Sequence, residues 1–264
     1  MTRPRRPETA AVRAGIEADA QHGAVVPPIH LSANYAFTGL EQPREYDYSR
    51  SGNPTRDLLA GALAELEGGA GAVVTGTGMS AVTLALTLAQ PGERVVAPHD
   101  CYGGTHRLLA ALHRTGRLAV EFVDFTDLEA VDRALRQAPR IAWVETPSNP
   151  LLRITDIAAV ASLAKANGSL LVVDNTFLSP VWQRPIGFGA DIVVHSTTKY
   201  LNGHSDVVGG AVVARDAELL EPLDWWGNCL GLTGSPFDSY LTLRGLRTLH
   251  ARMRQHADNA GRVV

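Results

Sequence analysis

The chain has 264 residues, which is enough for one large domain or two small ones. Its composition, 45% hydrophobic and 19% charged, allows a sizeable core, and the net charge of −3 argues against nucleic acid as a main partner. Two distant cysteines, Cys101 and Cys229, indicate neither a disulfide framework nor a zinc site. The basic N-terminus lacks the apolar segment of a signal peptide, and no apolar run approaches the length of a membrane span, so we expect a cytoplasmic protein that contacts neither membrane nor nucleic acid.

The first 55 residues show no regular pattern. Prolines, an Asn-Pro pair and several aromatic residues occur there, with little periodicity. The sequence therefore predicts an extended arm over residues 1–55 that has no core of its own.

Helices and strands alternate from Arg56 onwards. Helices are predicted over residues 56–69, 78–92, 103–116, 126–137 and 155–168, and strands over residues 70–75, 93–98, 118–124, 140–146, 169–175 and 190–196. Gly68 and Gly69 end the first helix, and Thr126 followed by Glu129 predicts a capping box at the start of the fourth. The strands are near-continuous apolar runs, which predicts an α/β domain over residues 56–249 with a mostly parallel, doubly covered sheet.

In such a sheet a ligand lies beyond the carboxyl ends of the strands. The strand over residues 190–196 leads there into "HSTTK", with Lys199 beside small hydroxyls. Lys199 is either a surface lysine in a turn or a desolvated amine that forms a Schiff base with a carbonyl. The strand over residues 169–175 delivers Asp174, whose carboxylate needs a positive partner, either a pyridinium N–H or a structural arginine.

Three other strand ends carry weaker signals. The stretch "GTGMSA" at residues 76–81 is either an ordinary glycine turn or the phosphate-binding start of a helix. Tyr102 either packs in the core or stacks its ring on a planar ligand. Asn149 either makes a turn with Pro150 or hydrogen-bonds a ring substituent. Together, a phosphate cradle, an aromatic ring, a carboxylate and an amine at one sheet edge are the parts needed to hold pyridoxal phosphate.

Several longer motifs carry a family resemblance. They are "YSRSGNPTR", "TGTGMSA", "HDCYGG", "ETPSNP", "VVDNTF", "HSTTKYLNGHSDVVGG" and "FDSYLTLRGLRTL", and they cover nearly the whole chain. The sequence resembles the pyridoxal-phosphate enzymes of cysteine and methionine metabolism, the cystathionine γ-synthase group. The resemblance implies the large α/β domain and N-terminal arm of the aspartate-aminotransferase type (fold type I), in a tetramer built from dimers.

The resemblance also implies roles for individual residues. Lys199 would form the Schiff base, Asp174 would pair with the pyridine nitrogen, and Tyr102 would stack on the ring and share proton transfers with Lys199. The cofactor phosphate would be bound by Gly78, Met79, Ser196 and Thr198, and by Tyr48 and Arg50 from a neighbouring subunit. Asn228 and Arg107 would bind substrate, although Arg107 is equally well explained as a solvated arginine on a helix.

The implied reaction is γ-replacement, in which cysteine displaces the acyloxy group of an O-acylhomoserine to give cystathionine for methionine biosynthesis. Ser51 follows Arg50 where some succinyl-ester enzymes carry two arginines, so O-succinylhomoserine is the expected substrate with the acyl group left open. The alternatives are a γ-lyase-type elimination and a non-catalytic remnant that binds the cofactor. Gly104 stands where methionine γ-lyases carry a cysteine, which disfavours that activity.

The last residues, 250–264, read as part of a helix. Because family members continue for another domain of about 100 residues, we expect residues 250–264 to begin a truncated C-terminal domain. We also expect the 264-residue chain to be inactive by itself, because the arginine that binds the substrate α-carboxylate would lie in that domain.

Overall fold

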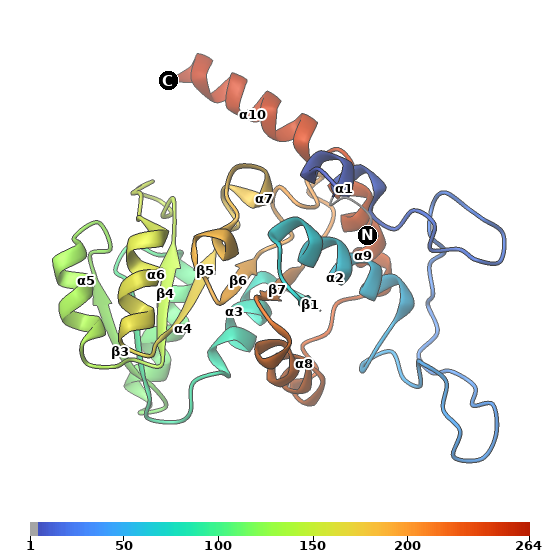
Figure 1. The fold of residues 1–264 in the computed structure, drawn as a ribbon, viewed down its shortest axis with the longest axis horizontal. Helices are drawn as coiled ribbons and strands as arrows, with labels where there is room; N and C mark the ends of the chain where they lie inside the picture. The colour runs from blue at the N-terminus through green and yellow to red at the C-terminus, as the bar shows by residue number, and fades with distance from the viewer. Residues whose placement is uncertain (1–4) are drawn as a thin grey trace.

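A sheet of seven strands separates two layers of helices in the computed structural model, which describes residues 5–264 (Figure 1). The strands are β1 Gly71–Thr75, β2 Arg94–Pro98, β3 Ala119–Val123, β4 Ile141–Glu145, β5 Leu170–Asp174, β6 Ile192–His195 and β7 Gly210–Ala214. The helices are α1 Pro7–Arg13, α2 Pro54–Glu67, α3 Gly78–Leu86, α4 Gly103–Arg114, α5 Leu128–Leu135, α6 Ile157–Ala166, α7 Ser179–Trp182, α8 Ala217–Leu230, α9 Pro236–Leu246 and α10 Leu249–Val263, with a 3-10 turn, η1, at Pro185–Phe188.

The sheet is mostly parallel, as the sequence predicts. Its strand order is β1-β7-β6-β5-β4-β2-β3, and all pairs from β6 to β3 are parallel. Strand β7 is antiparallel to both β6 and β1. The carboxyl ends of β2 to β6 therefore meet at one edge, where the polar residues that follow these strands are brought together.

Strand β7 is absent from the sequence prediction. Its apolar run is short and begins at Gly210, and glycine in a strand usually marks a weak or broken element. The glycine is needed here because a Cβ at Gly210 would lie 2.3 Å from the carbonyl oxygen of Thr77. Strand β7 thus carries Gly210 because it passes close to the segment before α3, and this glycine makes the strand hard to predict from the sequence.

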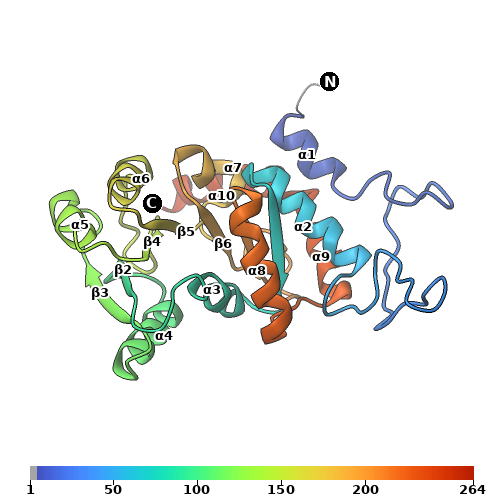
Figure 2. The same ribbon diagram turned by 60° about the horizontal axis from the view of Figure 1, so that its bottom comes forward.

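The two faces of the sheet bury different helices. One face packs against α3, α4 and α8, with Trp143 of β4 fully buried beneath them. The other face packs against α1, α2 and α9 at the β1 end and against α5 and α6 towards β3. Figure 2 shows α2 and α8 on opposite sides of β1. This double cover explains why the strands read as continuous apolar runs.

Helix α2 begins two residues earlier than predicted. Asn53 caps it by accepting hydrogen bonds from the backbone N–H groups of Thr55 and Arg56, and Pro54 takes the first helical position. The Asn-Pro pair is thus a helix start rather than an irregular segment. The predicted stop is confirmed, since Gly68 adopts the left-handed conformation with φ of 80°.

Two other local predictions are wrong. The capping box at Thr126 does not form, because Asp127 caps α5 through the N–H groups of Glu129 and Ala130, while the Thr126 hydroxyl donates to Asp124. Helix α1 also lies within the stretch that the sequence presents as irregular. Ala10 and Ala11 of α1 are buried against the sheet face that α2 and α9 also cover, so α1 belongs to the main core.

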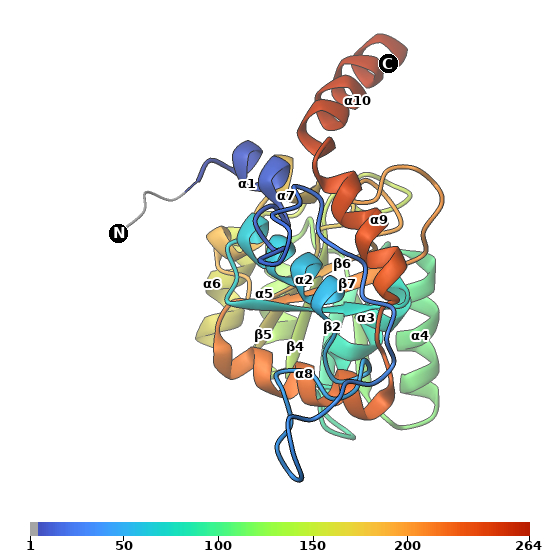
Figure 3. The same ribbon diagram turned by 90° about the vertical axis from the view of Figure 1, so that its right-hand side faces the viewer.

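Two segments extend from the body. The loops between α1 and α2 reach outward in Figure 1, with exposed apolar side chains such as Leu31 and Leu40. Helix α10 projects from the body in Figures 1 and 3. The arm and the domain limits at residues 55 and 250 stay predictions. Within residues 5–264 no helix combines the length and apolar character needed to cross a membrane.

Candidate active site

A cleft of about 1000 Å³ lies at the carboxyl ends of β4, β5 and β6, next to the first turns of α3 and α4. The predicted site residues that line it are Gly78, Met79, Tyr102, Asn149, Asp174, Ser196, Thr198 and Lys199. Segments from residue 78 to residue 199 thus converge on one cavity, and parallel strand ends are what bring them there.

Asp174 is the last residue of β5 and is only 9% exposed. Its Oδ1 accepts a hydrogen bond from the backbone N–H of Thr176 at 3.0 Å. Burial raises the pKa of this carboxyl, while the hydrogen bonds from Thr176 and the nearby His195 oppose the rise in pKa. No arginine or lysine among residues 5–264 forms an ion pair with Asp174, so the structural-arginine alternative is wrong. The carboxylate is instead available to a cationic ligand in the cleft.

Lys199 lies in the turn after β6 and lines the cleft, but its side chain is exposed. This exposure agrees with a lysine in a turn, and the desolvated Schiff-base amine stays a prediction. The cleft is wide and open, so water reaches the amine. A carbonyl compound in the cleft is what would exclude that water.

The predicted phosphate end of the site joins two segments. A Cβ at Gly78 would lie 2.7 Å from the Cβ of Ser196, so only glycine lets the start of α3 approach the turn after β6 so closely. The first N–H groups of a helix have no partner within the helix and attract an anion. The Thr198 hydroxyl accepts from the N–H of Gly209 at 3.0 Å and lies 3.2 Å from the Gly209 carbonyl oxygen. This hydroxyl is thus held in place by Gly209, the residue directly before β7.

Tyr102 and Asn149 approach the cleft from loops. Tyr102 precedes α4 and is 46% exposed, so its ring is not packed in the core. Asn149 lies in the loop after β4, and its side chain is also exposed. The Tyr102 ring and the Asn149 amide both line the open cleft, so both are free to contact a planar ligand there.

Glu145 and Thr176 are among the residues that line the cleft but are absent from the predicted site. Glu145 ends β4 just as Asp174 ends β5, and the signal that singles out Asp174, a carboxylate after an apolar strand, applies to it equally. Thr176 accepts a hydrogen bond from the N–H of Ser196 at 2.8 Å and so links the ends of β5 and β6. Nothing in the spacing of the sequence marks Thr176.

The remaining predicted residues lie outside this cleft. Arg50 hydrogen-bonds the backbone carbonyl of Asn228 at 2.8 Å and also its side chain, and its guanidinium lies 5.5 Å from the centre of the Tyr48 ring. Arg107 is exposed on α4. The structure therefore groups Tyr48, Arg50 and Asn228 together, and within one chain it brings none of these three, nor Arg107, to the cleft.

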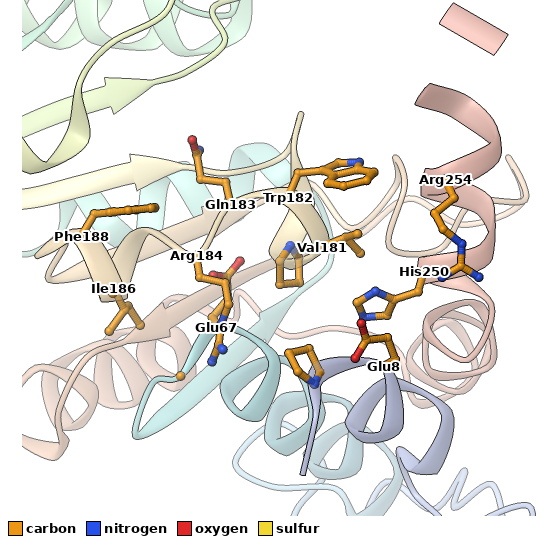
Figure 4. Close-up of a pocket in the computed structure, with 14 residues that line it drawn as sticks. Glu8, Glu67, Val181, Trp182, Gln183, Arg184, Ile186, Phe188, His250 and Arg254 are labelled. Carbon is orange, nitrogen blue, oxygen red and sulfur yellow. The ribbon is translucent and has the colours of Figure 1, made fainter. Parts of the chain in front are cut away.

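A second cavity of about 660 Å³ lies between α1, α7, α10 and the end of α2 (Figure 4). Figure 4 shows Trp182, Arg184 and His250 around it. None of the predicted cofactor or substrate residues lines this cavity, so the chemistry belongs to the first cleft.

The first cleft fits pyridoxal phosphate. Gly78 lets a helix start with free N–H groups lie directly against Ser196, Asp174 is a buried acid with no arginine or lysine partner among residues 5–264, and Lys199 supplies an amine to an aldehyde. A mostly parallel sheet that carries these groups at its carboxyl edge defines a pyridoxal-phosphate enzyme of fold type I.

Comparison with known proteins extends this assignment. A family model described as "Cys/Met metabolism PLP-dependent enzyme" matches residues 8–264. The chain belongs to this family, and pyridoxal phosphate is its cofactor.

Individual relatives are similar over nearly the whole chain. Cystathionine gamma-synthase of Escherichia coli is 57% identical over 261 residues, which are 98% of this chain and 68% of the relative. The crystal structure of cystathionine gamma synthase from Xanthomonas oryzae pv. oryzae in complex with aminoacrylate and cysteine has a TM-score of 0.97 and 61% identity, and the match covers 99% of this chain and 68% of that one.

A lyase has a similar fold. Cystathionine gamma-lyase from Lactobacillus plantarum, complexed with L-serine, has a TM-score of 0.94 and 40% identity, and the match covers 98% of this chain and 68% of that one. These similarities confirm the predicted fold class and an enzyme of the trans-sulfuration type. They include both reaction types that the sequence left open.

Proposed function

We propose that the protein catalyses γ-replacement, in which O-succinylhomoserine and cysteine give cystathionine and succinate. The bond from the γ-carbon to the acyloxy oxygen breaks, succinate leaves, and the cysteine sulfur forms the new bond after losing its proton. Sequence identity supports replacement over elimination. The two compared synthases are 57% and 61% identical to this chain, whereas the compared lyase is 40% identical.

The proposed roles follow from the positions of the side chains. When bound, pyridoxal phosphate supplies an electron sink for the charge that forms as the substrate α-proton leaves. Lys199 binds the cofactor aldehyde in the resting protein, takes the α-proton, and passes protons with the help of Tyr102. Asp174 keeps the pyridine nitrogen protonated, because this buried carboxylate has no arginine or lysine partner within residues 5–264.

The phosphate and substrate contacts complete the proposal. Gly78, Met79, Ser196 and Thr198 hold the phosphate, and Asn149 hydrogen-bonds the ring. Because Tyr48 and Arg50 lie outside the cleft of their own chain, we assign them to the phosphate of a neighbouring subunit in a tetramer. Light scattering of the purified protein tests the tetramer, and a monomeric mass with bound cofactor would contradict it.

Product analysis tests the reaction. The protein, saturated with pyridoxal phosphate, is incubated with O-succinylhomoserine or O-acetylhomoserine, with and without cysteine. We expect cystathionine and succinate with cysteine, and faster turnover of the succinyl ester. Release of 2-oxobutyrate and ammonia at an equal rate in the presence of cysteine would identify an elimination enzyme instead. Bound cofactor with no product from either ester would support a non-catalytic remnant.

A further inference from the structure

Glu145 joins two loops of the cleft through one carboxyl group. Its Oε2 accepts a hydrogen bond from the backbone N–H of Tyr102 at 2.8 Å, and its Oε1 accepts one from the backbone N–H of Asn149 at 2.9 Å. Glu145 is 5% exposed and ends β4 in the middle of the sheet. Strand β4 thus holds Tyr102 and Asn149, the two residues that approach the cleft from loops, through the two oxygens of one side chain.

Both loops need such support. Tyr102 precedes the first turn of α4 and makes no side-chain cap, so its N–H has no partner within the helix. Asn149 is exposed and stands between two prolines, Pro147 and Pro150, which have no N–H to donate. In both loops the backbone N–H of the site residue itself therefore bonds to Glu145.

Glu145 also stands beside the charged centre of the site. It is the direct partner of Asp174 in the pairing of β4 with β5. Burial, followed by the nearby charges of Asp174 and of Asp100 in the loop after β2, raises the pKa of Glu145 to about 8, although the two N–H groups oppose the rise.

We propose that Glu145 is a positioning residue that fixes the backbone at Tyr102 and Asn149 and so sets how the tyrosine ring and the asparagine amide face pyridoxal phosphate. This inference rests on the proposed cofactor contacts of Tyr102 and Asn149. It is independent of whether the enzyme replaces or eliminates the γ-substituent.

The test is Glu145→Gln, with Glu129→Gln as the matched control. Glutamine keeps the shape of the side chain but has one acceptor oxygen, so only one of the two N–H groups keeps its partner. Glu129 is exposed on α5 and 92% of its side chain is accessible. Loss of one hydrogen bond predicts a cofactor dissociation constant about 3- to 10-fold higher for Glu145→Gln, measured by absorbance titration.

The circular dichroism band of bound pyridoxal phosphate separates positioning from mere stability. A variant that is only less stable would show the wild-type band once it is saturated, whereas a displaced Tyr102 ring changes the band. We expect a changed band for Glu145→Gln and an unchanged band for Glu129→Gln. A wild-type dissociation constant and band for Glu145→Gln would overturn the proposal, whatever products the enzyme forms.

Hydrogen exchange in the unmodified protein provides a second measurement that does not depend on folding of the variant. The backbone N–H groups of Tyr102 and Asn149 belong to exposed residues, yet both bond to a buried carboxyl. We expect both to exchange slowly, as amides of the sheet do. Exchange at the rate of an unprotected loop at either position would equally overturn the proposal.

Discussion

His195 and Glu67 form a buried pair behind the cofactor cleft, with 2.6 Å between Nε2 of the histidine and Oε1 of the glutamate. Neither side chain is exposed to solvent. The same Oε1 accepts a hydrogen bond from Nδ2 of Asn175 at 2.8 Å. Glu67 ends α2. His195 directly precedes Ser196 in the chain, and Asn175 directly follows Asp174. Figure 4 shows Glu67 from the side of the second cavity.

Removal of the histidine from this pair should destabilise the fold. His195→Ala leaves Glu67 buried without its nearest partner, and breaking a buried pair in this way costs about 3–5 kcal/mol of the free energy of unfolding. Urea unfolding followed by circular dichroism measures the loss. His22→Ala, at an exposed position in the arm, is the control and should change the free energy of unfolding by less than about 0.5 kcal/mol. A similar small change for His195→Ala would show that the pair contributes nothing.

Lys199 is one of only two lysines in the chain, the other being Lys165. Borohydride reduction of the cofactor-bound protein should place the pyridoxyl label on Lys199, as peptide mapping would show. Lys199→Ala should abolish the label and lower turnover by roughly 10²- to 10⁴-fold, because the amine also carries the proton transfers. Lys165→Ala, at an exposed position on α6, should retain both. A label on Lys165 in the unmodified protein would refute the assignment.

Asp174→Asn should separate catalysis from binding. An amide cannot keep the pyridine nitrogen protonated, so we expect turnover to fall by about 100-fold or more. Cofactor affinity should change much less, since the other contacts remain. Steady-state kinetics and absorbance titration measure the two effects, with the exposed Asp258→Asn as control. Near-normal turnover of Asp174→Asn would leave Asp174 with a structural role only.

The raised pKa of Glu145 predicts how stability depends on pH in the cofactor-free protein. Its pKa is raised from 4.5 to about 8 on folding, so between these values the folded state binds more protons than the unfolded state. The free energy of unfolding should therefore fall as the pH rises from about 4.5 to 8. The raised pKa of Asp174 acts in the same direction. Urea unfolding across this range should show a shallower fall for Glu145→Gln, and an identical slope would contradict the shift.

Two adjacent glycines at the start of α4 make a matched pair. A Cβ at Gly104 would lie 2.5 Å from Cε1 of Tyr102, whereas a Cβ at Gly103 would meet nothing within 4 Å. Gly104→Ala should push the tyrosine ring aside and weaken cofactor binding about 2- to 10-fold, the range expected for a lost ring contact. Gly103→Ala should leave the affinity unchanged. Equal affinities for the two variants would show that the ring contributes little.

The sequence predicts the cleft well because parallel strand ends must meet. Asp174 and Lys199 each follow an apolar strand, so the sheet alone brings them together. Glu145 has the same signal but no obvious ligand, and its role depends on two backbone N–H groups that no pattern reveals. The contact of Arg50 with Asn228 joins residues 178 positions apart through an irregular arm, and no periodicity encodes it. Lys199 is exposed because solvent access depends on the shape of the whole cleft.

The antiparallel strand β7 also has a consequence for the order of events during synthesis. Strand β7 lies between β1 and β6, so β1, the first strand to be synthesised, is held in the sheet by β7, the last one. The start of α3 and the Lys199 turn can take up their native positions only after residue 214 has been made, since β7 ends there. Contacts so distant in sequence form late in folding. A nascent chain should therefore acquire its affinity for pyridoxal phosphate abruptly, with this strand, rather than gradually as each earlier strand is added.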